Sequence, residues 1–403
     1  MTGKLIFGIM MCLLVPLCLY ANDGMGNFPK NNNIFANRLF REENTKKGTE
    51  NFVISPISLN MAMSLVSNDA KGKTLQEFAS LLQNGPFADK FGKYDRNFSK
   101  YSQKDMNVYN RGLLANSKIL GVNNYKIANG IWLRGNYERN FFLIAKNYYN
   151  ADVSSLTQNS AKDINDWINR KTEGKITEMV DKIKPNDRAF IVNAVYFYSE
   201  WANSFPKYGT AENVPFYLEN GEKTSCTMMN DEREYKVLDY KKGKILIKNF
   251  KGYASMYFML PDEGVKLSDY IRTIDFNEVI TNDTEGDRLY RIQIPKFKIE
   301  YSADMNSTFR KMGLNEAFGP KADFTGLDRS DNIYISSVIH KATIGVDETG
   351  CEASAATVVR MAGKGAPRPA ENLFFNRPFA FAIVDELNDI VIFEGCVYKP
   401  ENM

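Results

Sequence analysis

The chain has 403 residues, 44% of them apolar and 25% charged, with a formal net charge of +3 at pH 7. This composition is typical of a soluble globular protein that buries a large core. A charge so small excludes a protein that binds nucleic acid through bulk charge alone.

The N-terminus has the pattern of a secretory signal peptide. Residues 1–21 hold one lysine, an apolar run from Leu5 to Leu19 and a small residue, Ala21, which predicts cleavage before Asn22. The alternative is a membrane anchor, but the run is interrupted by Pro16 and is shorter than the roughly 20 residues of a spanning helix. We therefore expect a secreted, extracellular chain with no membrane segment, whose net charge falls from +3 to +2 with the loss of the lysine.

The cysteines do not form a disulfide framework. Two of the five, Cys12 and Cys18, are in the signal peptide, which leaves Cys226, Cys351 and Cys396 in the mature chain. Three thiols allow one bridge at most, so the fold depends on its core.

Helical and strand patterns alternate irregularly along the chain, which predicts an α+β fold. Ser58–Leu82 is helical in spacing, with Ser55-Pro56 as a start signal and Gly72 as a break, and Asp163–Val180 is a second helix. Strands are predicted at Phe190–Phe197, Ala254–Leu260, Arg291–Ile299 and Ile390–Phe393. They are far apart in sequence, so at least one sheet joins distant strands.

The segment Gly350–Pro369 fits neither pattern, and a loop of this length inside a compact domain is usually functional or disordered. As a strand, its first half has one face that is small and uncharged, and Glu352 is on the other face. The small face consists of Cys351, Ala353, Ala355 and Thr357, and the other face of Glu352, Ser354 and Ala356. Such a strand can enter a sheet without burying a charge.

The second half of this segment suits a protease. Ala362–Ala366 is small and flexible, with the long cation Lys364 at its centre, and exposed tips of this kind are preferred cleavage sites. The residues alone leave two interpretations open, a bait that can insert into a sheet and a plain loop.

A series of motifs in a fixed order resembles the serpin family over the whole mature length. They are Asn51–Ser58, Ile164–Asn169, Thr172–Ile176, Asn193–Phe197, Trp201–Phe205, Met228-Met229, Leu260-Pro261, Pro295–Phe297, Gly313–Phe318, Asp323–Leu327, Ser336–Lys341, Asn376–Phe379 and Phe393–Gly395. Each motif is weak by itself, but their shared order is specific.

The resemblance implies one serpin domain over residues 22–403, with three β-sheets, about nine helices and a reactive-centre loop at about 348–372. It implies a hinge comprising Glu348, Gly350, Cys351, Glu352, Ala353, Ser354, Ala355, Ala356 and Thr357. Cysteine at 351, where Thr or Ser is commoner, departs from the family pattern, and oxidation of its thiol would affect the rate of insertion.

His340 is the only histidine, which disfavours a histidine-dependent hydrolase or a zinc site, so no enzyme activity and no metal are expected. The resemblance instead implies that His340, with Ser58 and Asn193, forms a shutter beneath the central sheet, with Trp201 at the sheet's upper end, the breach.

Family spacing implies that the reactive bond is Lys364–Gly365, and Arg360 and Arg368 are the alternatives. Arg368 lies between prolines, and cleavage at Arg360 would leave a short loop. A lysine predicts a protease of trypsin-like specificity, whose acidic pocket pairs with the ammonium group.

The implied function is suicide inhibition, in which the cleaved loop inserts into the central sheet and traps the acyl-enzyme. The alternative is a non-inhibitory serpin that acts as a carrier, storage protein or chaperone. We expect a monomer that forms a covalent complex with its protease, needs no cofactor and does not bind nucleic acid.

Two kinds of surface feature remain. Asn97, Asn282 and Asn306 begin glycosylation triplets. Basic residues at helical spacing predict a possible site for a heparin-like polyanion or glycosaminoglycan, and the alternative is a solvated surface face. They are Lys90, Lys93, Arg96, Lys100 and Lys104.

Overall fold

The computed structural model describes residues 28–83, 96–119, 125–135, 137–282, 286–328, 333–351 and 369–401. The predicted signal peptide and most of the predicted reactive-centre loop, residues 352–368, lie outside the described residues.

Nine α-helices and sixteen strands lie in the described part of the chain. The helices are α2 (Phe28–Lys47), α3 (Pro56–Ser67), α4 (Gly72–Gln83), α5 (Arg96–Ile119), α6 (Arg139–Tyr149), α7 (Ser160–Lys171), α8 (Leu267–Ile271), α9 (Phe276–Thr281) and α10 (Asn306–Lys311). The strands are β1 (Phe52–Ile54), β2 (Tyr125–Leu133), β3 (Asp152–Ser155), β4 (Ala189–Phe197), β5 (Ser199–Glu200), β6 (Ala211–Tyr217), β7 (Lys223–Asp239), β8 (Gly243–Asn249), β9 (Ala254–Pro261), β10 (Arg288–Pro295), β11 (Phe297–Asp304), β12 (Ile335–Val346), β13 (Gly350–Cys351), β14 (Glu371–Phe374), β15 (Phe379–Asp385) and β16 (Ile390–Val397).

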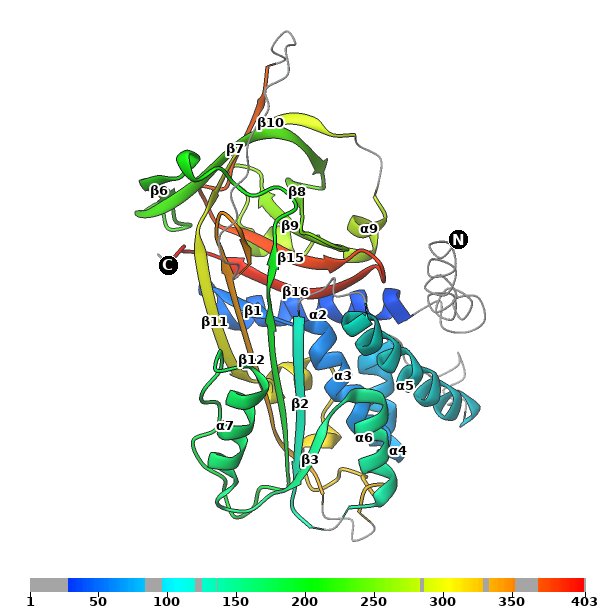
Figure 1. The fold of residues 1–403 in the computed structure, drawn as a ribbon. Helices are drawn as coiled ribbons and strands as arrows, with labels where there is room; N and C mark the ends of the chain where they lie inside the picture. Colours follow the sequence, from blue (N-terminus) through cyan, green and yellow to red (C-terminus); the bar gives the residue numbers. More distant parts are fainter. Residues whose placement is uncertain are drawn as a thin grey trace, which may run out of the picture.

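The long strands of a seven-stranded sheet run the length of the molecule (Figure 1). Its order is β3-β2-β4-β12, with β11 beyond β12 and the short strands β13 and β5 at the upper end. The central pair, β4 and β12, is parallel and runs from Ile335 opposite Ala189 to Thr343 opposite Tyr196. These strands are far apart in sequence, as predicted, and we call their junction the seam.

The second sheet has nine strands and crosses the upper half of the molecule (Figure 1). Its 17-residue strand β7 pairs with β6 and β10 through its first part and with β8 through its last four residues. The second and third sheets of the expected serpin fold are therefore continuous through β7.

Two hydrophobic cores cover the two faces of the seven-stranded sheet. The larger core joins this sheet to the second sheet and to α2–α6. The smaller core lies under α7, where Trp167 meets Trp132 of β2 edge to face, with ring centroids 5.2 Å apart. Both faces of the seam are thus buried, and β4 is buried along its whole length.

The two helical predictions had different outcomes. Ser55 caps α3 by accepting a hydrogen bond from the Ser58 N–H, Pro56 takes the first helical position, and Gly72 separates α3 from α4. The predicted helix Asp163–Val180 is wrong at its C-terminal end, because α7 stops at Lys171. Positive φ angles at Glu173 and Gly174 turn the chain out of the helix there.

The predicted strand Arg291–Ile299 is wrong as a single element. It divides into β10, ending at Pro295, and β11, starting at Phe297, which belong to different sheets. Pro295 has no N–H to continue a ladder, and Lys296 makes the crossing.

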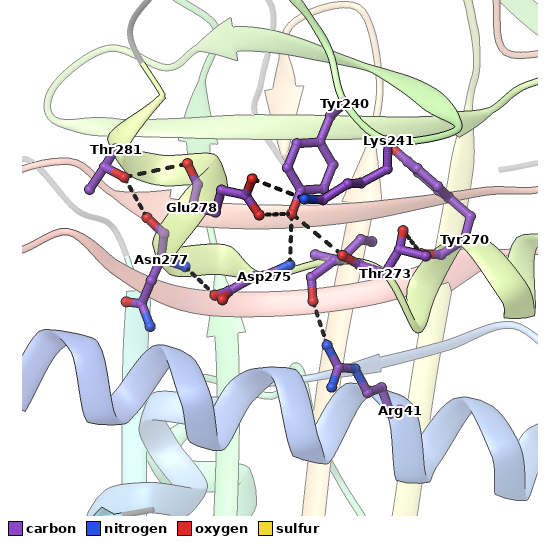
Figure 2. Close-up of polar contacts among 10 residues, drawn as sticks. Arg41, Tyr240, Lys241, Tyr270, Thr273, Asp275, Asn277, Glu278 and Thr281 are labelled. Atoms are coloured by element: carbon purple, nitrogen blue, oxygen red, sulfur yellow. Dashed lines mark hydrogen bonds and ion pairs between the residues drawn. The ribbon is translucent and has the colours of Figure 1, made fainter.

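A polar network fastens the α8–α9 segment to α2 and to Tyr240, the residue after β7 (Figure 2). The Tyr240 hydroxyl donates to Glu278 at 2.8 Å and accepts from the backbone N–H of Asp275 at 3.2 Å. Arg41 of α2 donates to the carbonyl of Ile274 at 2.7 Å. These bonds hold the α8–α9 segment against α2 and the end of β7.

Candidate functional site

The middle of the seam is closed by a buried hydrogen-bond network. His340 of β12 and Asn193 of β4 are paired across the seam, and His340 Nδ1 donates to Asn193 Oδ1 at 2.6 Å. His340 Nε2 accepts from the Ser55 N–H at 3.2 Å, and Ser55 Oγ donates to the carbonyl of Ile392 at 2.7 Å. The imidazole therefore joins β4 and β12 to the start of α3, which agrees with the expected shutter.

Asn193 extends this network across β4. Its Nδ2 donates to Ser58 Oγ at 2.5 Å and to Asn129 Oδ1 of β2 at 2.7 Å. Asn129 and Ser55 are network members that the sequence analysis missed in this role. Asn129 interrupts an apolar strand in the printed sequence, and this polar residue was the available signal.

His340 is held neutral. It is fully buried, and burial lowers its pKa to about 3. A neutral ring with Nδ1 protonated can donate to Asn193 and accept from Ser55 at once, as the network requires. The histidine is thus a structural link with both nitrogens in use, and no nucleophile is paired with it.

At the upper end of the seam, Gly350–Cys351, the first described residues of the predicted insertion strand, form the short strand β13. Cys351 of β13 pairs antiparallel with Val346 of β12 on one side and with Ser199 of β5 on the other. Gly350 pairs with Glu200, and both residues of β13 are buried. Since β5 follows β4 after a single residue, the start of the loop lies between the ends of the two seam strands.

Residues 201–205 hold the hinge from the side. The backbone N–H of Trp201 donates to the carbonyl of Thr349 at 2.8 Å, and that of Phe205 donates to the carbonyl of Glu348 at 2.9 Å. The indole N–H of Trp201 donates to the carbonyl of Asp347 at 2.9 Å. Trp201 and Phe205 therefore bind three successive carbonyls, those of Asp347, Glu348 and Thr349.

Glu348 anchors the hinge through its side chain. Its carboxylate accepts from Thr210 at 2.7 Å and pairs with Lys296 at 3.0 Å. Burial alone would raise the pKa of Glu348, but the hydrogen bonds from Thr210 and Lys296 hold it below its usual value. The residue is therefore charged at neutral pH.

A tight turn brings the chain from β12 into β13. Asp347 Oδ1 accepts from the N–H groups of Thr349 and Gly350, at 2.7 and 3.1 Å. A Cβ on Gly350 would collide with the backbone of Ser199 and Glu200. Only glycine permits this close approach, so Asp347 and Gly350 place the hinge in the seam.

The sequence of this chain is similar to a known protein family over almost its whole length. The model of the family described as serpin (serine protease inhibitor) matches residues 30–400. The chain belongs to the serpin family. An uncharacterized serpin-like protein of Methanosarcina mazei is 30% identical over 388 residues, covering 92% of this chain and 87% of its own. The leukocyte elastase inhibitor of Sus scrofa is 27% identical and covers 92% and 98%.

Solved serpin structures share the fold. The native thermophilic serpin tengpin superposes with a TM-score of 0.80 at 32% identity, covering 93% of this chain and 94% of its own. Human thyroxine-binding globulin in complex with thyroxine reaches 0.82 at 22% identity, covering 93% and 99%, which supports the fold alone. As a serpin, the chain belongs to a family of inhibitors rather than of enzymes.

The cysteines in the described part of this serpin form no disulfide. Cys226, Cys351 and Cys396 are all buried. Cys351 is 0% exposed, so its thiol is protected in the native hinge and the expected oxidation requires the hinge to leave the sheet.

Other predicted site residues lie wholly or partly outside the described part of this serpin. Those outside are Glu352–Thr357 of the hinge, the candidate cleavage residues Arg360, Lys364, Gly365 and Arg368, and Lys90 and Lys93. Arg96, Lys100 and Asn97 belong to α5, and Lys104 of the same helix is exposed.

The remaining glycosylation candidates have defined positions. Asn282 is the C-cap of α9. Asn306 donates through Nδ2 to the carbonyl of Ser336 at 2.8 Å and accepts from the N–H of Val338 at 3.1 Å. A glycan on Asn306 would compete with the first of these bonds.

The described residues of the serpin include no group of three or more His, Cys, Asp or Glu side chains that could hold a metal ion. Among the same residues, no helix is long and apolar enough to span a membrane.

Proposed function

We propose that this serpin inhibits trypsin-like serine proteases by trapping the acyl-enzyme, with the cleaved loop inserting between β4 and β12. The observation that supports this proposal is the position of Gly350–Cys351, which lies antiparallel to both flanking strands at the upper end of the seam. The rest of the loop could extend this strand between β4 and β12 without any change in the order of the other strands.

The register of β13 predicts where the rest of the loop would go. Cys351 is opposite Val346 on β12 and Ser199 on β5, and each further loop residue moves one position back along both partners. At Thr357 the two registers reach His340 and Asn193, which are themselves partners across the seam. The two independent registers therefore converge on the shutter.

The same register assigns the faces of the inserted strand. Ala353 and Ala355 would lie opposite Ile344 and Ala342 of β12, whose side chains belong to the larger core. Glu352 would lie opposite Gly345, on the other face, where its charge is not forced into this core. The pattern of small residues thus matches the face that insertion would bury.

The chemistry of trapping begins with an ordinary proteolytic step. The protease serine attacks the Lys364 carbonyl, an ester forms between Lys364 and the serine, and the amine of Gly365 leaves with the proton from the serine. Insertion would then carry the attached protease away before water hydrolyses the ester. Insertion would break the single β4–β12 ladder and form two antiparallel ladders in its place, and this net gain of paired strands would drive the step.

Incubation with trypsin tests the proposal. The expected result is an SDS-stable adduct of trypsin with the serpin chain that ends at Lys364, because denaturation releases the peptide that follows the cut bond. The control uses trypsin with a blocked catalytic serine, which should give no adduct. Cleavage of the loop without an adduct would refute trapping and favour the non-inhibitory alternative.

A matched pair of variants tests the predicted faces. Ala353→Arg would place a charge in the core, so the loop should be cleaved without trapping. Glu352→Arg changes the neighbouring residue on the other face and should retain the adduct. Equal adduct yields from the two variants would contradict the register.

The choice of Lys364 has its own test. Mass spectrometry of the C-terminal peptide released by denaturing the complex should show Gly365 as its first residue. A peptide that begins at Met361 or Pro369 would instead assign the bond to Arg360 or Arg368.

We further propose that the protein is secreted and glycosylated. The signal-like segment 1–21 and the triplets at Asn97 and Asn282 support this. When the chain is expressed in a secretory cell, the protein recovered from the culture medium should begin at Asn22. Its mass should fall on treatment with a glycosidase. Retention of residues 1–21 would contradict it.

We also propose a polyanion-binding site on α5. Arg96, Lys100 and Lys104 follow at every fourth position of this helix. Neutralising Lys93, Arg96 and Lys100 together should abolish any acceleration of inhibition by heparin, while the rate without heparin stays the same.

A further inference from the structure

A buried lysine lies directly behind the segment that holds the hinge. Lys248 of β8 is 3% exposed, and its Nζ donates to the carbonyl of Asn203 at 2.8 Å. The same ammonium lies 4.3 Å from the ring centroid of Phe205 and 5.2 Å from that of Trp201. Tyr235 of β7 forms a third wall at 5.5 Å. Aromatic faces at these distances attract a cation.

Three of these contacts are to a single stretch of chain, residues 201–205. The cation binds the backbone of this stretch at Asn203 and its rings at Trp201 and Phe205. Trp201 and Phe205 are also the residues whose N–H groups bind the hinge carbonyls of Thr349 and Glu348. Segment 201–205 is also bonded to the second sheet by the Ala202 N–H, which donates to the carbonyl of Asn249 at 2.9 Å, and by Arg233, which donates to the carbonyl of Ser204 at 3.2 Å. Lys248 is thus one of several links between the second sheet and the segment that binds the hinge.

The other charges around Lys248 come from β7. Asp231 and Arg233 form an ion pair, and Asp231 also accepts from the Tyr235 hydroxyl at 2.5 Å. The contacting side chains of the 201–205 segment, Trp201 and Phe205, carry no titratable group. The pair Glu348–Lys296 lies at the hinge itself. No carboxylate binds the ammonium of Lys248 directly among the ion pairs of the described residues, so the rings and one carbonyl must stabilise it.

We propose that Lys248 is a positioning residue for trapping, whose ammonium clasps segment 201–205 to β8 and so sets how readily the seam admits a strand. This inference rests on the proposed function, since it concerns the same insertion step. With the ammonium in place, the segment that lines the entrance stays fixed. Without the positive charge, the attraction to the two rings is lost and the carbonyl keeps only a weaker donor.

The clasp should respond to pH near neutrality. Burial, reinforced by Arg233 and opposed by Asp231, lowers the pKa of Lys248 to about 7. The ammonium is thus present below neutral pH and lost above it. The upper end of the seam should therefore open faster as the pH rises above about 7.

The test measures uptake of a strand without any protease. A synthetic peptide copying residues 352–363 is mixed with the full-length serpin, and the 1:1 complex is followed over time by native mass spectrometry between pH 6 and 9. We expect the wild-type uptake rate to rise about tenfold across this range, as the cation–π contacts are lost. Lys248→Met should take up the peptide fast at every pH, and Lys248→Arg slowly at every pH.

A further variant keeps the test valid if Lys248→Arg does not fold. Phe205→Leu keeps an apolar side chain but removes the nearest ring, so its uptake at pH 6 should be faster than that of the wild type. Uptake that is independent of pH and unchanged in Lys248→Met and Phe205→Leu would overturn the inference. So would the absence of uptake in the wild type and all variants, since the clasp would not then control the seam.

The trypsin assay separates this result from the proposed function. A serpin that traps trypsin but whose peptide uptake ignores Lys248 retains the proposed function and loses the clasp. A serpin that shows pH-dependent uptake but no trypsin adduct retains the clasp and loses the inhibitory function.

Discussion

The middle and the upper end of the seam are closed by different means. In the middle, His340 uses both ring nitrogens and Asn193 joins β4 to Ser58 and Asn129, so buried polar groups satisfy one another. At the upper end, the hinge is held by backbone hydrogen bonds from segment 201–205 and by Glu348, beside the buried Lys248.

The difference indicates an order of events. A fully satisfied buried network is costly to open, whereas the entrance depends on a few contacts that can be lost one at a time. We therefore infer that insertion begins at Gly350 and that the shutter yields last, when the incoming strand reaches His340.

The largest predicted effect is at the shutter. His340→Ala leaves Asn193 and the Ser55 N–H without partners and opens a cavity, so it should lower the free energy of unfolding by ~3–5 kcal/mol. Urea unfolding measures this change. The control is Lys341→Ala on the same strand, which should cost less than ~1 kcal/mol. Equal losses would show that the shutter is no stronger than its surroundings.

A pH series sharpens the same point. Below pH ~6.5 the unfolded chain binds a proton at His340, while the native protein does not until about pH 3. The native state is therefore destabilised as pH falls through this window, by ~1.4 kcal/mol per pH unit from this residue. The difference in unfolding free energy between wild type and His340→Gln should shrink with this slope. A constant difference would contradict a neutral, buried His340.

At the entrance, Gly350→Ala should have a smaller effect on stability. The added methyl collides with Ser199 and Glu200, so β13 must leave the seam, at a cost of ~1–3 kcal/mol. The fraction of serpin that forms an adduct should fall more than the stability does, so most of the variant should be cleaved without trapping the protease. Gel quantification of adduct against cleaved serpin measures this ratio, and an unchanged ratio would mean that insertion does not start at Gly350.

The smallest predicted effect is at Glu348. Glu348→Gln removes the ion pair with Lys296 but retains an acceptor for Thr210, so it should destabilise the protein by ~1 kcal/mol. Glu300→Gln on β11 breaks the exposed pair with Lys298 and should change stability by less than ~0.5 kcal/mol. Chemical denaturation compares the two, and equal values would place Glu348 among ordinary surface charges.

Much of the shutter and hinge could be predicted from the sequence. His340, Asn193, Ser58 and Trp201 lie in motifs whose order resembles the family, and the structure brings the first three together. The predicted alternation of faces from Cys351 to Thr357 stays a prediction, because both residues of β13 are buried and the residues after Cys351 lie outside the described part of the chain. Local pattern succeeds where a residue's role depends on its own strand.

The missed features depend on contacts across distant strands. In the sequence Lys248 looks like an ordinary cation in a mixed strand, and its burial depends on residues 201–205 and Tyr235 packing around it. Asn129 gains its role because β2 pairs with β4 at Asn193. The split between β10 and β11 likewise depends on two sheets that separate at Pro295. None of these pairings is a local property of the chain.

Hydrogen exchange on the cleaved protein tests the central claim most directly. After trypsin cuts the loop, the account predicts that backbone amides of residues 352–357 become strongly protected, because each gains a partner on β4 or β12. Protection should extend to Thr357, opposite His340 and Asn193. Amides in this segment that exchange as fast after cleavage as in a free peptide would show that the seam does not take in the loop.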